Sequence, residues 1–299
     1  MRTLVIGASG FIGRYVMRCL GASPEHDVSG TYRSRPAADD VNTWHQVELT
    51  DTPALERLFE QVRPHLVIHL AAMADVGTAE REPERATAVN VAATATIGRL
   101  CEQHGSRLIF VSTEYVYDGA GGPYREDRTP RPNTHYGRTK WEAEQEVAWE
   151  TENWSIVRTS IVYGWPEPGQ RNFASWLIEN LRNGRPYLAP ADVMRTPVYV
   201  EHLVDGIARM VGLDCPGILH IAGRDWVSMY DFATAIANAF DLDANLVQPA
   251  DADSQARAGA STRPDRLGLD CRETMRRLNL EHPGLAEGIA ALKAAAPER

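Results

Sequence analysis

The stretch TLVIGASGFIG, residues 3–13, decides the fold. Its first six residues form the short apolar run of a buried strand, and the residues from Phe11 onward have the apolar spacing of a helix. Glycines stand at and around the junction of the two, at positions 7, 10 and 13. Such glycines allow a tight turn, a close approach of the backbone to a pyrophosphate, and close packing of helix on strand. The stretch therefore predicts a strand, a phosphate-binding turn and a helix.

Strands and helices alternate through the first half of the chain. Strand-like runs fall at 27–33, 66–72, 107–113 and 154–160, and helical patterns fall at 55–64, at 85–105 and in WEAEQEVAWETE. Repeated alternation with continuous apolar strands predicts an α/β fold, a doubly wound parallel sheet of Rossmann type with helices on both faces.

The second half has fewer strand-like runs and more helix, loop and proline. We expect it to form a smaller mixed lobe that binds the substrate. The predicted dinucleotide-binding domain is 1–160 and the predicted lobe is 161–299. Within the lobe, 198–212 is expected to return to the first domain.

Composition narrows the class of protein. The 299 residues carry a formal net charge of −9, which argues against a nucleic acid or an anionic membrane as the main partner. No stretch approaches the roughly 18–20 apolar residues of a membrane span, and no targeting pattern is seen, so a cytoplasmic location is predicted. The four cysteines and nine histidines show no disulfide or metal-ligand spacing, so no metal site is predicted.

The turn after the first strand also predicts a cofactor site. The free N–H groups and the positive dipole end of the following helix favour a pyrophosphate there. The second strand ends TYRSR, so Arg33 and Arg35 stand where an NAD site usually has an acid. Guanidinium groups suit a 2′-phosphate by charge and by their forked donors. We therefore expect NADP(H), with NAD(H) as the alternative.

A second motif is HYGRTK, residues 135–140. On a helix, Tyr136 and Lys140 are one turn apart and share a face. A phenol beside an ammonium can be simple packing or an acid tuned for proton transfer. The spacing alone does not decide between them.

Taken together, GASGFIG, HLAA, VNVAAT, VSTEYVY, YGRTK and RTSIVYG resemble an extended short-chain dehydrogenase/reductase. More narrowly, the chain from STEYVYDG to YGRTKWEAE is similar to the dTDP-4-dehydrorhamnose reductases, as are AAMADVGTAEREPERATAVN and RTPVYVEHLVDGI. The resemblance implies reduction of a nucleotide-linked 4-keto-6-deoxy sugar with NADPH. It leaves the oligomer open, with a homodimer as the candidate.

The resemblance assigns roles residue by residue. Tyr136 is expected to be the general acid and Lys140 to bind the nicotinamide ribose. An ammonium about 5 Å from the phenol would also lower the pKa of Tyr136 by about two units. Thr113 is expected to donate a hydrogen bond to the substrate oxygen. The expected cofactor contacts, besides Tyr136, Lys140, Arg33 and Arg35, are Gly7, Ser9, Gly10, Phe11, Ile12, Gly13, Leu70, Ala71, Ala72 and Asn90.

Substrate contacts are implied at two sets of positions. One set follows strand ends in the first domain, and the other lies in the lobe: Asp75, Val76, Glu114 and Tyr115, then Asn172 with Phe173 and Arg195 to Pro197. Ile161 departs from the pattern, because many of these reductases have a Trp there. The departure leaves the sugar open.

Two other functions compete with the reductase. A nucleotide-sugar dehydratase or epimerase of the same superfamily is one, but the Asp-Glu pair of a dehydratase would fall on Glu114 and Tyr115, so its second carboxylate is missing. The other is an NADP-binding regulatory subunit like the beta subunit of methionine adenosyltransferase. Such a subunit could keep the glycine turn and catalyse no reaction. The intact set Thr113, Tyr136 and Lys140 favours an enzyme.

Overall fold

The computed structural model describes residues 1–34, 43–250 and 264–296, and Arg35 lies outside them. The chain forms two compact units. Unit 1 comprises Met1–Val116, Pro132–Arg158 and Ile207–Leu219, and unit 2 comprises Tyr117–Arg131, Thr159–Gly206 and His220–Arg299. Ile207–Leu219 belongs to unit 1. The bounds 198–212, expected from the sequence for the returning stretch, stay a prediction. The domain border near 160 stays a prediction.

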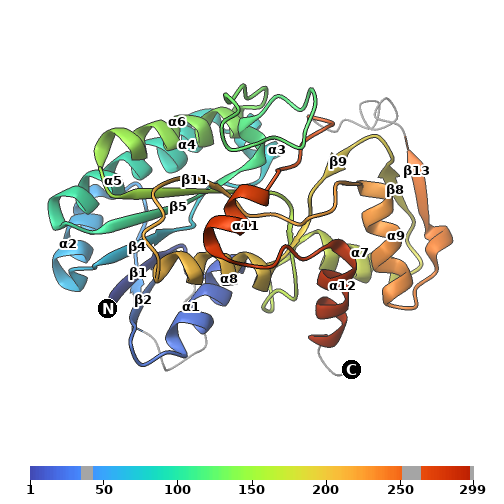
Figure 1. Cartoon of the computed structure of the whole chain (residues 1–299), viewed down its shortest axis with the longest axis horizontal. Coiled ribbons are helices and arrows are strands. Elements are labelled where there is room, and N and C mark those ends of the chain that lie inside the picture. The colour runs from blue at the N-terminus through green and yellow to red at the C-terminus, as the bar shows by residue number, and fades with distance from the viewer. Residues whose placement is uncertain (35–42, 251–263, 297–299) are drawn as a thin grey trace. The chain divides into compact units, whose positions relative to one another are not determined.

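Unit 1 is built on a seven-stranded sheet with the order β11-β6-β5-β4-β1-β2-β3 (Figure 1). Its strands are β1 (Arg2–Ile6), β2 (Asp27–Tyr32), β3 (Thr43–Gln46), β4 (Leu66–His69), β5 (Arg107–Thr113), β6 (Trp154–Thr159) and β11 (Gly217–His220). The pairings from β3 through β5 are parallel. The order 3-2-1-4-5-6 is that of the dinucleotide-binding fold. The predicted doubly wound sheet is confirmed.

Helices cover both faces of this sheet. Figure 1 shows α2, α5 and α6 on one face and α1 on the other. The helices of unit 1 are α1 (Phe11–Gly21), α2 (Thr52–Val62), α3 (Val76–Arg81), α4 (Pro83–Thr87), α5 (Ala93–His104) and α6 (His135–Glu150). Between the layers the apolar strand residues are buried: Leu4, Val67 and Phe110 are all fully inaccessible and pack in one core. The hydrophobic runs of the sequence thus became the centre of the sheet.

The helix predicted at 85–105 differs in detail from the structure. It is divided into α4, one π-helical turn (Ala88–Ala92) and α5. A π turn inserts an extra residue and changes which side chains face inward. Asn90 lies in this turn and is only 1% exposed. The sequence also did not indicate β3, α3 or β11, which are short and partly polar.

In its described residues, unit 2 is mixed, with three two-stranded pairings and several helices. The pairs are β7 (Val162–Tyr163) with β10 (Val198–Tyr199), β9 (Met194–Arg195) with β12 (Val227–Ser228), and β8 (Tyr187–Pro190) with β13 (Val247–Ala250). The helices are α7 (Phe173–Arg182), α9 (Met229–Ala239), α11 (Arg272–Leu278) and α12 (Leu285–Ala294), and α8 (Val200–Val211) runs from unit 2 into unit 1. Ring contacts of Phe173 with Tyr187 and Phe232 mark part of its core.

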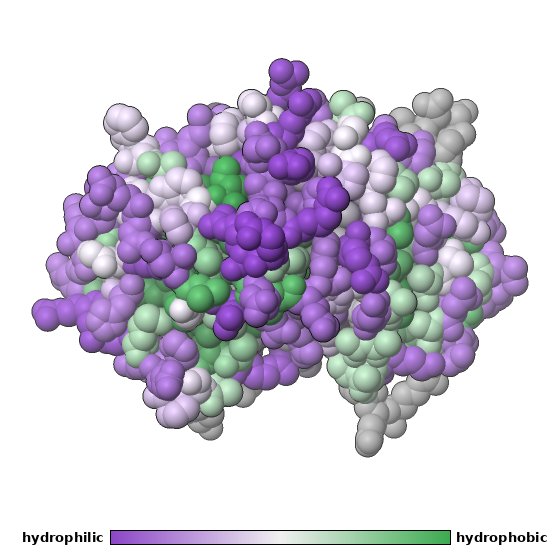
Figure 2. Space-filling view, viewed as in Figure 1, coloured by the Kyte–Doolittle hydropathy of each residue, from purple (hydrophilic) through white to green (hydrophobic). Residues whose placement is uncertain are grey.

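The surface is polar where the core is apolar. The face drawn in Figure 2 is mainly hydrophilic, with small hydrophobic areas between. Within the described ranges, no helix has both the length and the apolar character needed to cross a membrane.

The glycine turn of the opening stretch is tightly packed. Gly7 has φ +86°, and a Cβ there would lie 2.7 Å from the backbone nitrogen of Ala71. A Cβ on Gly13 would overlap the Gly7 carbonyl oxygen and would lie 2.7 Å from the Ala8 Cα. The first helix therefore approaches the turn at a distance that only glycine permits.

Gly13→Ala should consequently destabilise the fold. The new methyl group meets backbone atoms that cannot rotate away, so we expect a loss of about 1–3 kcal/mol in the free energy of unfolding, the range for overpacking. Urea denaturation measures it. Gly121→Ala is the matched control, because a Cβ there meets nothing within 4 Å. Equal stability of the two variants would contradict the packing described here.

Candidate active site

The site begins where α6 meets the end of β5. The Thr134 side chain caps α6 and accepts a hydrogen bond from the Gly137 nitrogen at 3.0 Å. A Cβ on Gly137 would overlap the carbonyl oxygen of Tyr115, so the first turn of the helix packs directly on the backbone that follows β5. This contact places Tyr136 beside the strand end. The Tyr136 phenol is hydrogen-bonded to Thr113, the last residue of β5.

Lys140 lies one turn further along α6 and is buried. Its side chain reaches β5, where Nζ donates a hydrogen bond to the Val111 carbonyl oxygen at 2.9 Å. The same nitrogen lies 4.0 Å from the centre of the Phe110 ring. The structure therefore brings Thr113, Tyr136 and Lys140 to one strand end, as the sequence suggested.

The electrostatics of the pair differ from the expectation. Burial raises the pKa of Tyr136 to about 12, opposed by the hydrogen bond to Thr113. Burial lowers the pKa of Lys140 to about 7, opposed by the charge of Glu144. The expected lowering of the phenol pKa is wrong for this structure, because desolvation outweighs other effects and the ammonium is directed at Val111.

Asn90 is held by backbone and side chain together. Its Oδ1 accepts from the Met73 nitrogen at 2.8 Å, and its Nδ2 donates to the Met73 carbonyl at 3.3 Å and to the Thr139 hydroxyl at 3.0 Å. Thr139 in turn donates to the Tyr136 carbonyl oxygen at 2.9 Å. Asn90 thus ties the segment after β4 to the first turn of α6. These contacts support a role for Asn90 in positioning the first turn of α6.

The predicted cofactor residues surround the turn after β1. The Gly7 nitrogen donates to the Thr31 hydroxyl at 3.0 Å, and the Ser9 nitrogen donates to the Thr31 carbonyl at 3.2 Å. Gly10 is the N-cap of α1 and has no side chain to occupy the free N–H groups of the first turn, which Phe11, Ile12 and Gly13 begin. The half-buried segment Leu70, Ala71 and Ala72 follows β4, the strand beside β1.

Two arginines lie near this turn. Arg33 follows β2 and is exposed. Arg14, which the sequence reading did not single out, lies on α1 with Nε 3.5 Å from the Ser9 carbonyl and its guanidinium 5.8 Å from the centre of the Trp44 ring. The sequence feature that could have drawn attention to Arg14 is its position directly after the third glycine.

The candidate substrate residues of unit 1 have varied surroundings. Asp75 caps α3, accepting from the Thr78 nitrogen at 2.8 Å. Val76 is buried in a hydrophobic cluster with Tyr136. Glu114 is 1% exposed, and its charge acts to raise the pKa of Tyr136. The Tyr115 ring lies edge-on to the Tyr136 ring, with centroids 5.7 Å apart. Glu114 and Tyr115 are thus the members that adjoin the predicted acid.

Two of the candidates in unit 2, Asn172 and Arg195, contact backbone. Asn172 caps α7 through a hydrogen bond from the Ser175 nitrogen at 3.2 Å, and it donates to the Gly164 carbonyl at 2.8 Å. Arg195 is 2% exposed and donates to the carbonyl of Met194 at 2.7 Å and to that of Pro264 at 2.8 Å. These contacts make Asn172 a helix cap and Arg195 a clamp on the segment that begins at Pro264.

A family model for the RmlD substrate binding domain matches residues 1–296. The chain belongs to this family. It is 32% identical over 303 residues to a probable low-salt glycan biosynthesis reductase, Agl14, of Haloferax volcanii, covering 99% of this chain and 98% of that protein. It is 30% identical over 277 residues to the methionine adenosyltransferase 2 subunit beta of Xenopus tropicalis, covering 90% and 80% of the two chains.

Among solved structures, the fold is similar to a dTDP-4-dehydrorhamnose reductase of Bacillus anthracis in complex with NADP. The TM-score is 0.86 at 26% identity, over 99% of each chain.

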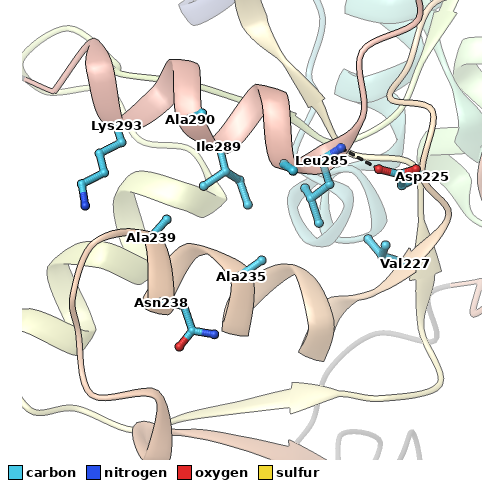
Figure 3. A pocket seen from close by; sticks show the side chains of 10 residues that line it. Asp225, Val227, Ala235, Asn238, Ala239, Leu285, Ile289, Ala290 and Lys293 are labelled. Carbon is cyan, nitrogen blue, oxygen red and sulfur yellow. Dashed lines mark hydrogen bonds between the residues drawn. The ribbon is translucent and has the colours of Figure 1, made fainter.

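A pocket of about 640 Å³ lies elsewhere, within unit 2 (Figure 3). Figure 3 shows Ala235 and Ala239 of α9 pointing toward α12, from which Ile289 points back toward α9. None of the predicted site residues lines it. The described residues also contain no group of three or more His, Cys, Asp or Glu that could hold a metal ion.

Thr139→Val tests the positioning network. The change keeps the shape but deletes the hydroxyl that joins Asn90 to the Tyr136 carbonyl, so the buried Asn90 amide loses one of its two acceptors. We expect a loss of about 1–3 kcal/mol in the free energy of unfolding. Thr139→Ser, which keeps both hydrogen bonds and loses one methyl, should lose about 1 kcal/mol or less. If urea titration finds Thr139→Val as stable as Thr139→Ser, the hydroxyl does not carry the network.

Proposed function

We propose that this protein is an NADPH-dependent reductase of a nucleotide-linked 4-keto-6-deoxy sugar. The observation that carries the proposal is the strand end of β5, where a phenol hydrogen-bonded to Thr113 and a buried lysine lie on consecutive turns of α6. Membership of the RmlD family, and similarity to dTDP-4-dehydrorhamnose reductases and a glycan biosynthesis reductase, support the sugar-nucleotide class.

The turn between β1 and α1 fits a dinucleotide. Glycines at 7 and 13 leave no room for a Cβ, so the backbone itself forms the cradle, and the N-terminus of α1 offers free N–H groups. Bound there, NADPH would supply a hydride. Gly7, Ser9 and Gly10 would hold its pyrophosphate, and Arg33 would approach the adenosine 2′-phosphate.

The chain's own residues would handle the proton. Tyr136 would donate its phenolic proton to the keto oxygen, because a phenol with a raised pKa stays protonated at neutral pH. Thr113 would hold the same oxygen by its hydroxyl. The protonated Lys140 would bind the nicotinamide ribose of the cofactor. Its positive charge would also stabilise the phenolate that remains after proton transfer. Burial of Tyr136 and Lys140 excludes water and strengthens each of these interactions.

A regulatory role is the second candidate. The similarity to the beta subunit of methionine adenosyltransferase 2 favours it. A subunit of that kind needs the dinucleotide turn but has no need of a proton donor. The presence of Thr113, Tyr136 and Lys140 around one strand end supports the enzyme.

A screen of nucleotide-linked 4-keto-6-deoxy sugars with the purified protein separates the two candidates. We expect at least one sugar to be reduced with stoichiometric oxidation of NADPH. In single turnover, Tyr136→Phe should slow the chemical step roughly 10²–10⁴-fold, the usual contribution of a positioned acid. NADPH affinity should change little, because the phenol is not expected to hold the cofactor. Tight NADPH binding with no sugar reduced would favour the regulatory role.

Arg33→Ala tests the cofactor preference. If the exposed guanidinium binds the 2′-phosphate, its removal should weaken NADPH by about 1.5–3 kcal/mol, because a charge-assisted hydrogen bond is lost. NADH, which lacks that phosphate, is the internal control and should bind the variant as it binds the wild type. Fluorescence titration measures both. Equal weakening of the two cofactors would show that Arg33 does not select between them.

A further inference from the structure

A buried ion pair lies next to the candidate site. Glu144 of α6 and Arg158 of β6 are 2% and 0% exposed. Arg158 Nε donates to Glu144 Oε1 at 2.9 Å and to Oε2 at 3.2 Å, and its NH2 nitrogen donates to Oε2 at 2.5 Å. A fork of this kind fixes both the position and the charge of the carboxylate.

The pair continues the helical face of the site. Tyr136, Lys140 and Glu144 follow one another at intervals of four residues along α6. Side chains four apart on a helix have Cβ atoms about 5–6 Å from each other, so Glu144 stands beside Lys140 on the side away from Tyr136. Arg158 then holds Glu144 from the neighbouring strand. Phenol, ammonium, carboxylate and guanidinium therefore form one buried row.

A buried ammonium such as that of Lys140 stays charged more readily when a negative charge lies nearby. The two groups that the Lys140 ammonium contacts, the Val111 carbonyl and the Phe110 ring of β5, are neutral. His69 of β4 adds no competing positive charge, because burial and the charge of Lys140 lower its pKa to about 3, so the ring is neutral. Glu114 acts on Tyr136, at the opposite end of the row. Glu144 is the carboxylate whose charge acts on Lys140 and opposes the effect of burial.

We propose that Glu144, aimed by Arg158, is the counter-charge that keeps the buried Lys140 ammonium protonated near neutral pH and so sets the upper pH limit of the site. Glu144 and Arg158 are positioning residues in this account, acting through Lys140. The consequence for cofactor binding rests on the proposed function. The effect on Lys140 itself does not.

The composition of the chain makes the effect directly measurable. Lys140 and Lys293 are the only lysines in the sequence. Lys293 pairs with Asp241 at 3.1 Å, and its side chain is 52% exposed. Protein labelled with [ε-¹³C]lysine should therefore give two NMR signals, one from the buried site and one from a surface reference. Titration of the first signal yields the pKa of Lys140 without cofactor or substrate.

Three proteins form the comparison. Glu144→Gln removes the negative charge and leaves Arg158, so the pKa of Lys140 should fall by about 1–3 units, the effect of losing a close opposite charge. The double variant Glu144→Leu/Arg158→Met removes both charges, so its fall should be smaller. Apolar replacement of a whole buried pair often preserves the fold, which keeps the test valid if the single variant does not fold. The Lys293 signal should titrate alike in all three.

The outcomes are distinct. A Lys140 pKa in the order wild type, double variant, Glu144→Gln, from highest to lowest, supports the proposal. A folded double variant whose Lys140 titrates as in the wild type overturns it and leaves the pair a structural one. The pH above which NADPH affinity declines should move with the Lys140 pKa. Failure of NADPH to bind at any pH would count against the proposed function, whereas the lysine titration would still decide the role of Glu144.

Discussion

The candidate site depends on the contact between the first turn of α6 and the end of β5. Gly137 lies against the Tyr115 carbonyl so closely that no Cβ fits, and Thr134 fixes where the helix begins. From that start, helical geometry alone sets Tyr136, Lys140 and Glu144 on one face. A helix beginning one residue later would rotate this face by about 100° and remove the phenol from Thr113. The chemistry proposed for the protein therefore begins in a packing constraint.

Burial then determines the protonation states that this geometry produces. A phenol out of water holds its proton, which suits a donor, while an ammonium out of water tends to lose its own. Burial therefore favours the proposed role of Tyr136 but opposes that of Lys140, because Lys140 must be charged to play its role. Glu144, held in place by Arg158, supplies the negative charge that opposes the loss of the Lys140 proton. A buried pair is poor evidence for stability by itself, and its place beside Lys140 gives it an electrostatic reason to be there.

Local sequence patterns predicted the sheet and the glycine turn, because each depends on neighbours a few residues apart. The set Thr113, Tyr136 and Lys140 came instead from the resemblance to a family, since Thr113 is far from Tyr136 in the sequence. The charge environment of Lys140 was not predicted, since Arg158 reaches Glu144 only once β6 lies beside α6. The inward position of Asn90 depends on a π turn, which has no clear sequence signal. Asn172 shows a further limit: asparagine suits both a helix cap and a substrate contact, and the structure gives it a cap.

Hydride transfer from NADPH to a sugar carbon is the central claim, and isotope transfer tests it most directly. The protein would be incubated with a nucleotide-linked 4-keto-6-deoxy sugar and NADPH carrying deuterium at both positions of C4 of the dihydronicotinamide. Mass spectrometry and NMR of the sugar product would locate the label. The account predicts one deuterium on the carbon that bore the keto group, with the hydroxyl proton donated by Tyr136, which water then reprotonates. A reduced sugar without that deuterium, or recovery of the keto sugar unchanged with every substrate of this class, would contradict it.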